Sequence, residues 1–144
     1  MLKNNCVILF EELKKAVDNY LKQEHIRGET KYIDAYLAAT IHSIIDYADG
    51  YLDPNKQDNV FNACRYANNT LKHNTSLVTH KRITGGVHFP IHFPLEFPPI
   101  EVVWNYNKSL VLQSKNQQQQ FENLFAGKPI IETLSPLMSK IENS

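Results

Sequence analysis

Three apolar stripes at helical spacing constrain the fold of this chain more than any other feature of its sequence. The first consists of Cys6, Phe10, Leu13, Val17 and Leu21. The second consists of Ile33, Leu37, Ile41, Ile44 and Ala48, widened by Tyr36 and Ile45, and the third of Val60, Cys64, Ala67 and Leu71. Because an α-helix turns once in 3.6 residues, each stripe forms one apolar side of a helix that needs a partner. Three such helices joined by short loops predict an antiparallel bundle.

Residues typical of helix ends flank these stripes. The first helix is predicted over residues 5–24, and the second is predicted to end at Gly50. Asp53 suits a helix N-cap and Pro54 suits the first helical position, since proline lacks the N–H that this position does not use. The third helix is therefore predicted over residues 54–74.

The pattern changes after this helix, in the sequence GGVHFPIHFPLEFPPIEVVW, whose repeated prolines exclude a helix. Apolar residues alternate there with polar residues and prolines, which predicts an edge strand over residues 88–97 with one apolar face. Leu77–Ile83 is its predicted hairpin partner, and Ile100–Trp104 is predicted as a further strand. A small antiparallel β insertion is expected around residues 77–105.

The remaining residues are predicted to be helical again. One helix is expected over residues 115–126 with Gly127 as its stop, and a last one is expected to break or restart at Ser135-Pro136. The predicted fold class is mainly α, with three N-terminal helices and one or two C-terminal helices in one domain. That domain divides into a helical bundle (1–75), the β insertion (77–105) and C-terminal helices (114–142).

Composition and charge narrow the class of protein. Of the 144 residues, 42% are hydrophobic and 21% are charged, as in soluble globular proteins. The net charge is zero, so nucleic-acid binding would need a local patch. With no apolar run of membrane-spanning length and no signal peptide, a cytoplasmic protein without membrane contact is expected. The two cysteines, Cys6 and Cys64, are predicted to be buried thiols.

A metal site and a cofactor are not predicted. His88, His92 and Glu96 are spaced four residues apart, but on a strand this spacing separates them by about 13 Å. Two of them therefore cannot bind one ion without further ligands, and an exposed strand face is the preferred interpretation.

The sequence RYANNTLKHN, residues 65–74, is the candidate functional site. At 100° per residue, Arg65, Asn68, Asn69, Lys72 and His73 fall within roughly 140° on one side of the third helix, away from the apolar stripe. This side is either a solvated helix face or a site, because a cation, two amides and a proton-transfer group can bind and cleave a phosphodiester.

The spacing within this site favours a dimer. Arg65 and His73 lie eight residues apart, about 12 Å along the helix axis, which is too far for one chain to grip one phosphate with both. A two-fold homodimer with antiparallel helices brings Arg65 of one chain towards His73 of the other.

The same residues resemble the signature of the HEPN family (higher eukaryotes and prokaryotes nucleotide-binding domains). These are small helical bundles, many of them metal-independent ribonucleases of toxin–antitoxin, abortive-infection and CRISPR-associated systems. Their motif is an Arg, often followed by a polar residue, with four to six residues in all between the Arg and a His. His73 matches the motif His and Asn69 the polar residue, whereas Asn68 stands at the Arg position and Arg65 lies one turn earlier.

The resemblance implies His73 and Arg65 as catalytic residues of an endoribonuclease, with Asn68, Asn69 and Lys72 binding RNA. The alternative is a non-catalytic module of the same fold that binds nucleic acid or a protein, or dimerises, with the Phe-rich hairpin as a binding surface. A third interpretation is a structural protein whose polar helix side is only solvated.

Overall fold

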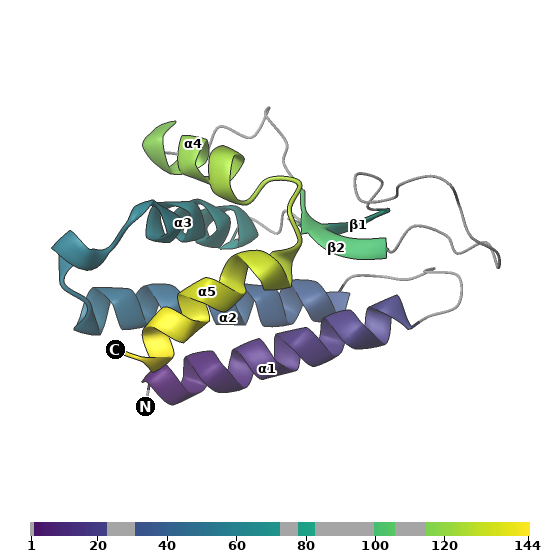
Figure 1. Ribbon diagram of the computed structural model, residues 1–144, viewed down its shortest axis with the longest axis horizontal. Helices are drawn as coiled ribbons and strands as arrows, with labels where there is room; N and C mark the ends of the chain where they lie inside the picture. Colours follow the sequence, from purple (N-terminus) through teal and green to yellow (C-terminus); the bar gives the residue numbers. More distant parts are fainter. Residues whose placement is uncertain (1, 23–30, 73–77, 83–99, 106–114) are drawn as a thin grey trace, which may run out of the picture.

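The five α-helices and one two-stranded sheet of the computed structural model lie within residues 2–22, 31–72, 78–82, 100–105 and 115–144, the part of the chain that the structure describes. The helices are α1 (Leu2–Leu21), α2 (Lys31–Tyr51), α3 (Asn59–Lys72), α4 (Lys115–Leu124) and α5 (Ile130–Glu142), with a 3₁₀ turn, η1 (Pro54–Lys56), before α3. Strands β1 (Val78–Arg82) and β2 (Ile100–Trp104) pair antiparallel. The predicted fold class, a mainly α antiparallel bundle with a small antiparallel sheet, is confirmed; α1, α2 and α3 alternate in direction (Figure 1).

The predicted apolar stripes form the buried sides of the first three helices. All stripe residues of α1 and α2 are buried except Leu21 and Tyr36, which are half-buried. In α3, Cys64 and Ala67 are buried as predicted, but Val60 and Leu71 are only half-buried. The buried side of α3 is wider than its stripe and also includes Phe61, Ala63, Tyr66 and Thr70. The reason is that α3 packs against both α2 and α4.

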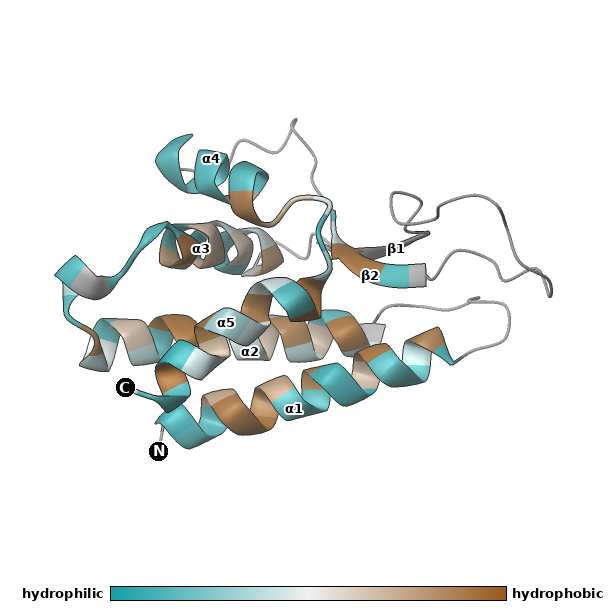
Figure 2. Cartoon of the chain, in the orientation of Figure 1, coloured by the Kyte–Doolittle hydropathy of each residue, from teal (hydrophilic) through white to brown (hydrophobic). Residues whose placement is uncertain are grey.

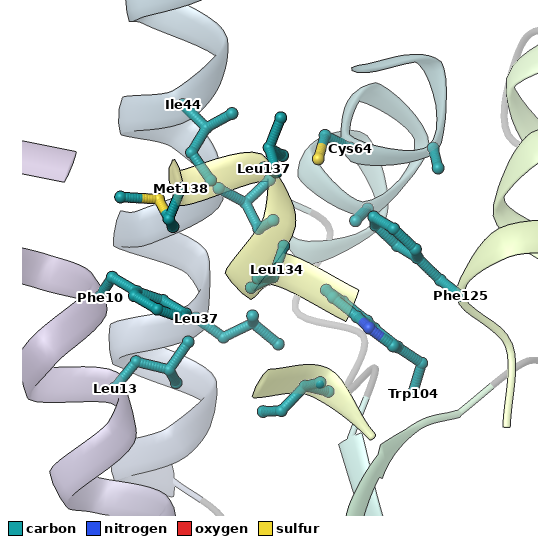
Figure 3. Packing of buried hydrophobic residues seen from close by; sticks show 14 of the residues in the cluster. Phe10, Leu13, Leu37, Ile44, Cys64, Trp104, Phe125, Leu134, Leu137 and Met138 are labelled. Carbon is teal, nitrogen blue, oxygen red and sulfur yellow. The ribbon is translucent and has the colours of Figure 1, made fainter. Parts of the chain in front are cut away.

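Helix α5 crosses in front of α2 in Figure 1 and lies against α1 and β2. Its buried residues are Ile130, Leu134, Leu137, Met138 and Ile141. Figure 3 shows Leu134, Leu137 and Met138 among side chains of α1 and α2. Figure 2 shows the same arrangement as apolar segments of α1, α2 and α5 on the sides where these helices meet. The last helix therefore supplies part of the central core.

Strand β2 is anchored to the link between α4 and α5 through Trp104. Its indole stacks on Phe125 with ring centroids 4.9 Å apart, and its Nε1 donates a hydrogen bond to Thr133 Oγ1 at 2.7 Å. Its backbone N donates to the Lys128 carbonyl, and its carbonyl accepts from Gly127 N. Because Trp104 is only 1% exposed, these bonds satisfy polar groups that water cannot reach.

The third helix begins later than the sequence predicts. Residues 54–56 form η1, and the Asp53 side chain accepts a hydrogen bond from Asn55 N at 3.0 Å. Helix α3 starts at Asn59, where Asp58 Oδ1 accepts from Val60 N at 3.1 Å. The predicted cap at Asp53 is thus present, but it caps one 3₁₀ turn, and Asp58 provides a second cap for α3.

The last helix is not broken at Pro136, where the sequence predicts a break. Helix α5 is continuous from Ile130 to Glu142. A proline at this position leaves the carbonyl of Glu132 without its helical N–H partner. Both Pro136 and Glu132 are exposed, so water can bond that carbonyl, and the helix continues.

Other boundaries shift by a few residues. Helix α1 begins and ends earlier than predicted, and α2 continues past Gly50 to Tyr51. The sheet pairs β1 with β2, a pairing that the sequence does not predict, while the strand predicted over 88–97 lies outside the described residues. In the ranges described above, no helix is both long enough and apolar enough to span a bilayer.

Gly127 lies between α4 and α5, where a substitution tests its left-handed backbone conformation. Its φ is +76°, and a methyl group placed on it would meet no atom within 4 Å. We expect Gly127→Ala to lower the free energy of unfolding by about 1 kcal/mol in urea denaturation, because left-handed backbone is costly for residues other than glycine.

Gly50→Ala is the matched control. Gly50 is equally open but lies within α2, so alanine is expected to raise the free energy of unfolding by about 0.5 kcal/mol or more. If both substitutions changed stability in the same direction, the conformational explanation would be wrong.

Candidate functional site

Of the candidate site residues, the structure describes the side chains of Arg65, Asn68 and Asn69, and none of the three is fully exposed. Arg65, Asn68 and Asn69 are each half-buried. Lys72 is the last residue of α3, and His73 lies outside the described residues. The structure therefore describes the first two turns of the candidate site and not its predicted proton-transfer group.

Arg65 is held against the end of α2 by two side chains. Its Nη2 donates to Asp49 Oδ1 at 2.7 Å and to Gln57 Oε1 at 2.8 Å, while Nη1 donates to Asp49 Oδ2 at 3.4 Å. A guanidinium is planar and fork-shaped, so two parallel bonds to one carboxylate fix its orientation. We call Arg65, Asp49 and Gln57 the arginine clamp.

Gln57 connects this clamp to the end of α2. Its Nε2 donates to the carbonyls of Ala48 at 3.0 Å and Leu52 at 3.3 Å. The Ala48 carbonyl also accepts from Leu52 N at 3.1 Å, so Gln57 adds a second bond there and gives the Leu52 carbonyl, just past the helix end, a donor. One amide side chain thus links the end of α2 to the guanidinium on α3.

The clamp favours the charged form of Asp49. The hydrogen bonds from Arg65 lower the pKa of the Asp49 carboxyl, the positive charge of Arg65 lowers it further, and slight burial opposes both effects. The side chains of Arg65 and Asp49 are 26% and 57% exposed. An ion pair this open contributes up to about 1 kcal/mol. Because the Arg65 guanidinium already bonds to Asp49, a phosphate that binds it has to displace the Asp49 carboxylate.

The described side chains of the candidate site are one guanidinium and two amides. The amides of Asn68 and Asn69 can donate to phosphate oxygens and can donate to and accept from base edges. Arg65 does not lie free beside them, because its guanidinium bonds to Asp49 and Gln57. The predicted pairing of Arg65 with His73 stays a prediction.

Sequence reasoning missed two members of the clamp, Asp49 and Gln57. Four acids, Asp46, Asp49, Asp53 and Asp58, lie at or near the turn between α2 and α3, and each is a plausible partner for Arg65 by charge alone. The choice among them depends on how α3 docks on α2, and no local pattern reports that.

A search for metal ligands among the described residues finds no group of three or more His, Cys, Asp or Glu side chains that could hold an ion. The trio that the sequence analysis considered, His88, His92 and Glu96, lies outside those residues.

Both cysteines are buried free thiols, as predicted. Cys6 and Cys64 are each 0% exposed, and Cys6 Sγ donates to Ser43 Oγ at 3.5 Å. Burial raises the pKa of both thiols, so neither forms a nucleophilic thiolate near neutral pH.

No family model, curated protein or solved structure matches this chain. The resemblance to the HEPN family therefore depends on the bundle and on residues 65–74 alone. The class that the fold itself defines is a mainly α antiparallel bundle with a two-stranded sheet.

The arginine clamp predicts a pH-dependent coupling between two helices. In a double-mutant cycle of Arg65→Ala and Asp49→Ala, we expect a coupling of about 0.5–1 kcal/mol at pH 7, measured by urea unfolding. The folded-state pKa of Asp49 lies below its unfolded value of about 3.9, so this contribution is present above pH 4 and is lost as the pH falls through the folded pKa.

Arg65→Lys is the control for this cycle, because it keeps the charge and removes the fork. We expect it to retain less than half of the coupling. A coupling that is unchanged from pH 7 to pH 2.5 would show that the ion pair does not contribute.

The buried thiols give a separate prediction. Ellman's reagent is expected to leave Cys6 and Cys64 unmodified in the native protein and to titrate both in denaturant, because burial disfavours the thiolate. Fast modification of either thiol without denaturant would mean that the core opens there.

Proposed function

We propose that this chain is a HEPN-like protein of a bacterial or phage defence system, or of a toxin–antitoxin system. In this proposal it is a cytoplasmic homodimer that binds RNA through the polar side of α3 without cleaving it. The helical bundle and the polar residues 65–74 support the family assignment. The protein would act by binding RNA and so blocking other proteins from it, or by presenting the RNA to a protein partner.

The arginine clamp is the observation that favours binding over cleavage. A ribonuclease site needs a cation placed where negative charge develops on the phosphate. Arg65 bonds to a carboxylate and an amide instead, at 2.7 and 2.8 Å. Asn68, at the position of the motif Arg, is a neutral amide that cannot balance that charge.

The half-buried amides fit the remaining task of recognition. Asn68 is half-buried on the same side of α3 as Arg65 and Asn69, and its amide has both donors and an acceptor. Because the chain has no net charge, long-range attraction of RNA is weak, and affinity must come from local contacts such as these.

Metal-independent cleavage is the second candidate function, and the exposure of the clamp favours it. Asp49 is 57% exposed, so a phosphodiester could replace its carboxylate on Arg65 at a cost of about 1 kcal/mol or less. In a homodimer, the freed Arg65 would hold the phosphate while His73 of the other chain moves the proton of the 2′-hydroxyl.

Asn68→Arg tests RNA contact at the polar side of α3 by placing a cation at the motif position, and cleavage by the wild-type protein distinguishes the two functions. With labelled single-stranded RNA and EDTA, we expect the wild-type protein to bind and leave the RNA intact. We expect Asn68→Arg to bind about ten-fold more tightly, since an Arg–phosphate contact adds a charged hydrogen bond.

His73→Ala is the control for chemistry, and Asp49→Asn is the control for the clamp. Wild-type cleavage that survives EDTA and is lost in His73→Ala would overturn the binding proposal and establish the second candidate. Faster cleavage in Asp49→Asn would show that Arg65 is the cation released. Absence of RNA binding in the wild-type protein and in Asn68→Arg would reject both functions, and sedimentation of the native protein tests the homodimer.

A further inference from the structure

A pocket of about 360 Å³ lies between the C-terminal half of α1 and the first turns of α2. Its volume is within the range of small-ligand sites, which begins near 300 Å³. Three aromatic and three polar side chains characterise its lining: Tyr20, Tyr32, Tyr36, Glu12, Lys15 and Asn19. The pocket shares none of these residues with the polar side of α3.

The aromatic side chains come from both helices. Tyr32 and Tyr36 are one helical turn apart and therefore lie on one side of α2. Tyr32 is 66% exposed, whereas Tyr20 of α1 is 4% exposed. Burial raises the pKa of the Tyr20 phenol above its ordinary value. The accessible ring of Tyr32 provides a surface on which a flat ligand can stack.

The polar side chains leave the pocket without net charge. Lys15 Nζ lies 3.2 Å from Glu12 Oε1, so the one cation and the one anion of the lining compensate each other. Glu12 would repel a phosphate, and Lys15 would repel a cationic ligand. A neutral ligand meets neither repulsion, and Asn19 can both donate hydrogen bonds to it and accept them.

We propose that this pocket binds a neutral nucleobase, stacked on the exposed tyrosine with its polar edge towards Asn19 and Glu12. A nucleobase has the three properties that the lining selects: a flat π face, hydrogen-bonding edges and no charge. The proposal does not depend on RNA binding by α3.

Adenosine is the probe, because it carries a base without phosphate. In isothermal titration of the full chain, we expect Tyr32→Leu to weaken adenosine binding about five-fold or more, since stacking on one aromatic side chain is worth at least that factor. Tyr32→Trp is expected to restore binding. Because the Tyr32 side chain is largely exposed, these substitutions should leave the melting temperature nearly unchanged.

Tyr51→Leu is the matched control. Tyr51 is 68% exposed, lies on the same helix and is not part of the pocket, so its loss should leave adenosine binding unchanged. Lack of adenosine binding, an equal effect of Tyr51→Leu, or competition by ribose 5-phosphate would each overturn the proposal. If neither the wild-type protein nor Asn68→Arg binds RNA but both bind adenosine, the function proposed for α3 is wrong and the pocket proposal stands.

Discussion

The burial of α5 is the interaction on which the rest of the structure depends. Five of its thirteen residues are buried, and it contacts both α1 and β2. At about 1.5–3 kcal/mol for each buried aliphatic side chain, this one helix outweighs any single polar contact in the molecule. Figure 3 shows its side chains between the α1–α2 pair and the aromatic cluster of Trp104 and Phe125.

The position of α3 follows in part from this packing. Lys140 at the end of α5 lies 3.3 Å from Asp58, which also caps α3, and 5.7 Å from the ring centroid of Phe61. The exposed Lys140–Asp58 pair contributes little energy. The buried side chain of Phe61 therefore does more to fix the start of α3 than this charge pair does. Once α3 begins there and packs on α2, Arg65 faces Asp49.

The arginine clamp is therefore a consequence of the fold and also a limit on function. The same docking of α3 on α2 that buries Cys64 and Ala67 brings Arg65 to a carboxylate and an amide of its own chain. A substrate phosphate can bind this guanidinium only by displacing the exposed Asp49 carboxylate.

The sequence predicts elements whose cause is local and fails where the cause is distant. The stripes of α1 and α2 follow from helical period, and they are confirmed except at the half-buried Leu21 and Tyr36. Helix α4 ends at Leu124, two residues earlier than predicted, and the left-handed Gly127 lies in the link that follows it. The start of α3 is missed because Asp53 and Asp58 carry the same capping signal. The clamp is missed because sixteen residues separate Arg65 from Asp49, and only tertiary packing selects that acid.

Pro136 shows the limit of a local rule. A proline inside a helix usually breaks it, but here the affected turn is exposed while Leu134, Leu137 and Met138 on either side are buried. The apolar contacts of those neighbours outweigh one lost hydrogen bond, so the tertiary structure keeps the helix continuous.

The most direct measurement is the NMR signal of the Arg65 guanidinium while single-stranded RNA is added. The titration is followed through the side-chain amide signals of Asn68 and Asn69, which report occupancy of the polar side of α3. If Arg65 is a structural member of the clamp, its Nη signals stay in place while the amide signals move to saturation. If the Arg65 signals instead move together with those amides, and the Asp49 carboxyl signal reports loss of its partner, Arg65 binds the phosphate and the structural role is wrong.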